Sequence, residues 1–169
     1  MEMYERVRAI NKLYPDAKYD IADDNSITWF DDRTMPTDDD LAQVITDLED
    51  EDRYISLKIT TTNYIYENYP QNKQNSDLTD KFYFDSQLRE AGITDLDKQV
   101  NDQVTAFYSG TSIDDIIAGL TDDMKIPLGQ LIKVAIRVQW VQMCKAAYMD
   151  AKLNKTVLTL PEVNDVVVD

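Results

Sequence analysis

The stretch Ile126–Asn154, with the sequence IPLGQLIKVAIRVQWVQMCKAAYMDAKLN, decides the fold of this chain. Pro127 suits the first turn of a helix, where its missing N–H is not needed. Apolar residues then recur at helical spacing without a break. The stripe that they form widens along the helix until most of its circumference is apolar. A helix of this kind is buried by its neighbours. We therefore predict a helix at about residues 127–154 that is either the central core helix or an oligomer seam, with Ile136 inside.

A membrane span is the rival interpretation of the same stretch, and the polar residues within it argue against that interpretation. They interrupt every window of about 20 residues, the length that a span needs, and such polar heads are costly in hydrocarbon. These residues are Lys133, Arg137, Gln139, Gln142 and Lys145.

Length and charge limit the classes of function. The chain has 169 residues, enough for one domain or two small ones, and a net charge of −15. This charge argues against binding nucleic acid or an anionic membrane, because phosphate groups are bound by clustered Lys and Arg. It favours solubility, basic partners or bound cations.

Cysteine and histidine usage limits the chemistry further. The single cysteine, Cys144, excludes an internal disulfide framework and lies in the apolar helix, where we expect a buried, inert thiol. The chain has no histidine, so it lacks the commonest general base and metal ligand. The opening MEMYERVRAI has no signal-peptide pattern, so we expect a protein of a cytoplasm or of a particle assembled there.

The N-terminal residues predict a helix, a hairpin and a second helix. Apolar residues from Met3 to Tyr14 follow helical spacing, and Pro15 ends that segment. Alternating residues on both sides of the turn Asp23–Ser26 predict a β-hairpin over residues 18–32. Thr37 is a good N-cap for a helix with Asp38–Asp40 in its first turn and a buried stripe that runs to Leu48.

The middle of the chain is less clear. Residues 54–69 fit a helix or a strand, with the helix slightly favoured, and residues 71–80 are polar enough to form a linker. Aromatic residues flank that polar segment, and they fit either core packing or an interface with another protein. Three helices are then expected, opened by Ser76, Thr94 and Ser112, the first two closed by Gly92 and Gly110.

The C-terminal residues are apolar and favour extended structure. Residues 156–163, TVLTLPEV, fit a short strand, and Val166, Val167 and Val168 form an exposed apolar terminus unless another surface covers them. We therefore expect these three valines to contact a partner protein, together with Trp29 of the hairpin if it faces outward.

Acidic clusters are the remaining candidates for chemistry. An EF-hand loop beginning at Asp20 would place Ala22 at its third position and Asn25 where glycine is needed, so the pattern fails. Asp38–Asp40 are explained by helix capping, and the other clusters fit solvated surface. We predict no catalytic residue, no metal site and no cofactor.

Residues 10–48 resemble the opening of small tail-fibre-associated and tail-assembly-chaperone proteins of tailed bacteriophages. In those proteins a short helix ends in Tyr-Pro and is followed by a strand, an acidic turn, a strand with Trp, and Pro-Thr before an acidic helix. The matching residues here are Tyr14-Pro15-Asp16, Ile21, Asp23-Asp24, Ile27, Trp29, Pro36-Thr37 and Leu41. The Trp- and Arg-containing C-terminal segment of the chaperone members is absent. The resemblance implies a tail protein with a role in the tail, baseplate or fibre attachment.

These observations predict a mainly α member of the α+β class. An N-terminal helix and hairpin module at residues 1–70 precedes a helical domain at residues 71–169, built as a bundle around the long helix. We expect a non-enzymatic tail protein of the virion, or of the host cytoplasm during assembly. Its partners are other tail or fibre proteins or further copies of itself, with no nucleic acid and no membrane. The alternatives are an acidic DNA mimic that inhibits a nucleic-acid-binding protein and, more weakly supported, a metal enzyme based on Asp and Glu.

Overall fold

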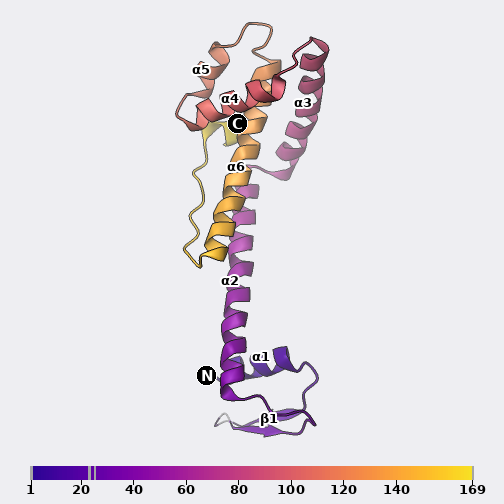
Figure 1. The fold of residues 1–169 in the computed structure, drawn as a ribbon, viewed down its shortest axis with the longest axis vertical. Coiled ribbons are helices and arrows are strands. Elements are labelled where there is room, and N and C mark those ends of the chain that lie inside the picture. Colours follow the sequence, from indigo (N-terminus) through magenta and orange to yellow (C-terminus); the bar gives the residue numbers. More distant parts are fainter. Residues whose placement is uncertain (1, 23, 25, 169) are drawn as a thin grey trace. The chain divides into compact units, whose positions relative to one another are not determined.

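The structure is a computed structural model that describes residues 2–22, 24 and 26–168. The chain is mainly helical, with 68% of its residues in helices, a short N-terminal helix and a two-stranded antiparallel hairpin (Figure 1). The chain divides into two compact units, Met1–Ser56 and Leu57–Asp169. Helix α2 (Asp38–Asn68) has residues in both units. Within the described residues, no helix combines the length and apolarity that a membrane crossing requires.

The first unit contains the predicted helix and hairpin. Helix α1 spans Met3–Leu13, and strands β1 (Tyr19–Ile21) and β2 (Ile27–Trp29) pair with Tyr19 opposite Trp29. The predicted turn lies partly outside the described residues, because Asp23 and Asn25 are not among them. The small core of the unit consists of Ala9, Ile10 and Leu41, with hairpin side chains packed against it.

Helix α2 (Asp38–Asn68) begins at the predicted cap. The Thr37 hydroxyl accepts a hydrogen bond from the Asp40 N–H at 3.1 Å, while the Asp40 carboxylate accepts one from the Thr37 N–H at 2.9 Å. These reciprocal bonds satisfy backbone N–H groups at the helix start. The helix favoured for residues 54–69 is observed up to Asn68, where α2 ends, and the hydroxyl of buried Thr61 donates to the Leu57 carbonyl inside it.

The polar segment 71–80 is not a linker, because it forms the first half of helix α3 (Gln71–Glu90). The helix begins directly after Pro70, so the expectation that Ser76 opens it is wrong, and Ser76 lies inside the helix. The Gln74 side chain donates to the Tyr69 carbonyl at 2.7 Å across the junction with α2. One polar residue of the segment, Asp77, is buried. The segment looked like a linker because it is polar, but one of its polar side chains, Asp77, forms an ion pair with Arg137 inside the protein.

The next helices follow the predicted order. Gly92, with φ of 89°, closes the α3 end as expected, and α4 (Leu96–Tyr108) begins after Asp95 instead of Thr94. Gly110, with φ of 107°, follows α4. Helix α5 (Ile113–Ala118) is capped by the Ser112 hydroxyl, as predicted.

Helix α6 (Pro127–Leu153) is the predicted long helix, and Ile136 is fully buried in it. Its N-terminal half contributes Leu128, Leu131, Ile132 and Ile136 to a core shared with α3, α4, α5 and the C-terminal residues. The expectation that the helix is covered nearly all round is wrong, because Val138 (47% exposed), Met149 (45%) and Leu153 (72%) face solvent.

The C-terminal residues form no strand. Residues 155–164 have no regular secondary structure, and a short helix α7 (Asp165–Val168) follows them. We call residues 155–167 the C-terminal strap. From the end of α6 it returns along that helix, as the yellow segment of Figure 1 shows.

Candidate functional site

The predicted partner residue Trp29 does not face outward. Its ring stacks on Tyr19 and meets the edge of Tyr14, with centroids 6.0 Å apart in both pairs, and its indole N–H donates to the Arg33 carbonyl at 2.7 Å. These contacts place Trp29 against the core of the first unit. The exposed aromatic residue of the hairpin is its neighbour Phe30, which is 64% exposed and which the sequence interpretation missed.

The predicted exposed terminus is also buried. Val166 is 1% exposed and Val167 is 0% exposed, because both pack into the apolar clusters around α6. The third predicted residue, Val168, lies in α7, but its side chain is outside the described residues. The expectation of an exposed apolar end is therefore wrong for the two described valines, since they cover the chain's own core.

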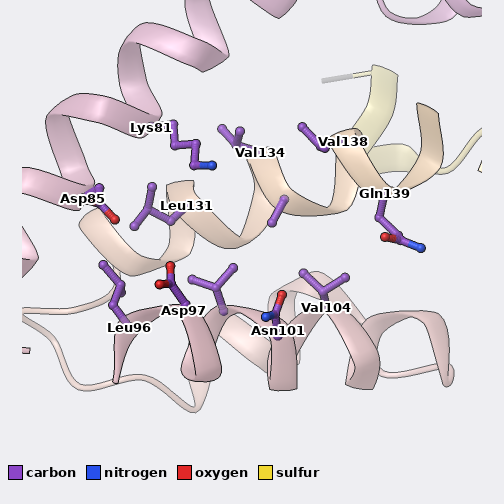
Figure 2. Close-up of a pocket in the computed structure, with 12 residues that line it drawn as sticks. Lys81, Asp85, Leu96, Asp97, Asn101, Val104, Leu131, Val134, Val138 and Gln139 are labelled. Carbon is purple, nitrogen blue, oxygen red and sulfur yellow. The ribbon is translucent and has the colours of Figure 1, made fainter. Parts of the chain in front are cut away.

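The second unit contains a groove that the sequence did not reveal. It lies between helices α3, α4 and α6, has a volume of about 320 Å³, and is open to solvent (Figure 2). Its floor is apolar because the facing sides of α4 and α6 carry aliphatic side chains: Leu96, Val100, Val104, Leu131, Val134, Ala135 and Val138. Leu96, Leu131 and Val134 are buried beneath this floor, Val138 is exposed, and the other floor residues are half-buried. An apolar hollow with polar edges is typical of a surface that binds another molecule.

The polar rim of the groove carries charges of both signs. Figure 2 shows Lys81 reaching toward α6, Asp85 and Asp97 toward one end, and Gln139 at the other end. The Arg89 guanidinium donates to Asp85 at 2.7 Å and approaches Asp97 at 3.4 Å, so it joins α3 to α4 at the acidic end. The hydrogen bond from Arg89 lowers the pKa of Asp85, which is therefore ionised at neutral pH.

This arrangement fits apolar side chains better than it fits a phosphate group. Two carboxylates and one ammonium border an aliphatic floor, with Asn101 and Gln139 as the uncharged polar groups. Arg89 offsets the charge of Asp85, so a bound anion would meet mainly the repulsion of the exposed Asp97. An apolar side chain flanked by Lys or Arg would meet complementary chemistry.

A buried ionic network lies beside the groove, on α3 and α6. Arg137 Nη1 donates to both carboxylate oxygens of Asp77, at 3.0 and 3.1 Å, and Arg137 Nε donates to the Val166 carbonyl at 2.6 Å. The Tyr69 hydroxyl donates to Asp77 at 2.7 Å. Burial, and next the hydrogen bond to Asp77, raise the pKa of Tyr69 above its usual value. Each of these donors has an acceptor, so the network fits a structural role.

Cys144 is buried, as predicted from the apolar helix around it. Burial raises the pKa of its thiol to about 11, which leaves almost no thiolate at neutral pH. Among the described residues, no group of three or more His, Cys, Asp or Glu side chains is arranged to hold a metal ion.

The chain was compared with protein-family models, curated proteins and solved structures, and none of them matches it. Candidate functions therefore rest on the residues and their geometry.

One sequence signal pointed toward the groove without locating it. Val138 belongs to the apolar surface that makes α6 look wholly buried. Because that surface is wider than the helices that cover it, Val138 stays 47% exposed. Phe82 and Tyr83 of α3 are 68% and 58% exposed and do not line the groove.

Proposed function

We propose that this chain is a non-enzymatic bacteriophage tail protein, a virion component or an assembly factor that binds other tail, baseplate or tail-fibre proteins. The observation that carries the proposal is the helix, hairpin and helix opening at residues 10–48, whose order follows that of small tail proteins. In the first unit these residues pack on one another. Tyr14 meets Trp29, Arg33 lies 4.6 Å from the Tyr14 ring centroid, and Thr37 caps α2.

We also infer that the second unit is a helical bundle organised around α6. Support comes from contacts that converge on that helix. The Tyr108 hydroxyl of α4 donates to the Ile136 carbonyl at 2.9 Å, and Asp77 of α3 binds Arg137. A rigid bundle would hold the walls of the groove in one geometry, which favours binding without a large ordering cost.

The groove is the proposed contact surface for a partner. Its aliphatic floor would take apolar side chains of another tail protein. Asp85 is already paired with Arg89, so the rim carboxylate open to a Lys or Arg of the partner is Asp97, whose side chain is 85% exposed. The net charge of −15 favours a basic partner surface in the same way.

A pull-down from phage-infected cells, with the captured proteins identified by mass spectrometry, tests the proposal. The full-length chain should retain tail, baseplate or fibre proteins at moderate salt, and Val138→Asp should reduce their amount at least tenfold. Val138 is 47% exposed, so the substitution leaves the core intact. Met149→Asp is the matched control, because Met149 is 45% exposed on the same helix and outside the groove, and it should bind like wild type.

An acidic DNA mimic is the second candidate, and it has the net charge of −15 in its favour. Against it, three carboxylates of α2 are already ion-paired with α1, through Arg6–Asp38, Arg8–Asp52 and Lys12–Glu51. The same pull-down separates the candidates, because a DNA mimic would capture nucleic-acid enzymes that wash off steeply with salt. That outcome, without tail proteins, would refute the tail assignment.

A further inference from the structure

The C-terminal strap is bound to the second unit much as a separate peptide would be. Three side chains of the helices donate to its backbone carbonyls: Tyr64 to Pro161 at 2.9 Å, Trp140 to Glu162 at 3.0 Å, and Arg137 to Val166 at 2.6 Å. Hydrogen bonds from these side chains to backbone carbonyls of the strap do not require that the strap and the helices belong to the same chain.

Apolar residues of the strap occupy defined places between these bonds. Leu160, Val163 and Val167 pack with Tyr69, Trp140 and Cys144, while Val166 enters the cluster around Ile132 and Ile136. The receiving surface is thus complementary to the sequence of this strap, and every further copy of the chain carries the same strap and the same surface.

The connection that returns the strap to its surface is short. From Trp140 to Leu153, α6 rises about 20 Å at 1.5 Å per residue. The eight steps from Asn154 to Glu162 reach at most about 28 Å when fully extended. Lys155, at the start of the connection, has φ of 53°, and Val157 is 89% exposed. The reach exceeds the rise of the helix, so the connection can close within one copy, and its strain lies at the positive φ of Lys155. A strained hinge residue favours exchange of the segment that follows it between copies.

We propose that the strap is exchangeable, so that residues 160–167 of one copy occupy the receiving surface of a second copy, and reciprocally, in a dimer. Each surface in that dimer is filled by the same residues as in the monomer. The connection differs, because it passes between the two chains and no longer has to return along its own α6.

Changing the length of the connection tests the proposal on the full chain. Deleting Thr156–Thr159 leaves four steps that reach about 14 Å, too few to return along the helix. This variant should be a dimer, with twice the 19.5 kDa chain mass by light scattering. Inserting Gly-Ser-Gly-Ser after Val157 relaxes the connection and should give a monomer at concentrations where wild type forms dimers.

Cys144 distinguishes strap exchange from other association, because it lies under the strap and is the only cysteine. In an exchanged dimer it should react with a thiol reagent as slowly as in the monomer. A deletion variant that is monomeric, or dimeric with a rapidly reacting Cys144, would overturn the proposal. An insertion variant that dimerises to the same extent as wild type would also overturn it. The insertion variant keeps a strap long enough to bind its own chain, so it serves as the test if the deletion variant does not fold.

Discussion

Replacing Asp77 by asparagine should destabilise the second unit strongly while changing the shape of the side chain very little. The carboxylate lies 3.0 and 3.1 Å from Arg137 Nη1, and the two side chains are 8% and 7% exposed. At an effective dielectric constant near 20, opposite charges at this distance attract by about 5 kcal/mol. The asparagine side chain would keep a hydrogen bond but leave the guanidinium charge buried and unpaired, so we expect a loss of about 3 kcal/mol.

The two tryptophans allow each unit to be followed separately. Trp29 belongs to the first unit and Trp140 to the second, and the chain has no others. In a Trp29→Phe background, urea unfolding followed by fluorescence therefore reports on the second unit. The Asp77→Asn midpoint should fall, whereas Asp85→Asn on the same helix should hardly change it, because the Asp85–Arg89 pair is solvent-exposed.

A combined substitution tests the reasoning more strictly than the single one. Asp77→Leu with Arg137→Met removes both charges, and Tyr69→Phe removes the hydroxyl that would lose its acceptor Asp77. Only the Val166 carbonyl then lacks its donor, so the triple variant should cost less than Asp77→Asn alone. An Asp77→Asn variant within about 1 kcal/mol of wild type would show that the pair is not desolvated, and the network would then carry no structural role.

Three further outcomes follow from the core and from the pKa values. Ile136→Asp should cost several kcal/mol, on the order of 4, and Gln139→Asp on the exposed face should melt like wild type. Trp29→Ala should lower the free energy of unfolding of the first unit by about 2 kcal/mol, read by circular dichroism, and Phe30→Ala by much less. The unfolded Cys144 thiol loses its proton near pH 9.0 and the folded one near 11, so the folded state binds more protons in this window and stability should fall as the pH rises through it. Cys144→Ala should flatten that decline, and an unchanged slope would contradict the assignment.

Periodicity and capping were sufficient to predict most elements. Thr37, Ser112 and Pro127 each begin a helix where local chemistry requires it, and Gly92 and Gly110 follow helices with the positive φ that glycine tolerates. These signals act within a few residues of the chain, so a single sequence contains them.

Features that depend on distant residues were not predictable in this way. Asp77 looked like part of a linker because its partner Arg137 is 60 residues away, and Arg137 was recognised only as a charge that argues against a membrane span. Val166 and Val167 looked exposed because the surface that covers them is formed by α6 and its neighbours. The groove needs three helices at once, and no local pattern specifies which apolar residues such helices leave uncovered.

The bond from Arg137 to Val166 also sets an order of events during synthesis. The acceptor carbonyl lies 29 residues after the donor, so at ordinary translation rates it is made about 1.5 to 6 s later. During that interval Arg137 of α6 lacks its main-chain acceptor. The hydrogen bond from Trp140 to the Glu162 carbonyl has not formed either. A nascent chain paused in this window would expose the unfilled apolar surface to chaperones, and release of the strap residues would end that exposure.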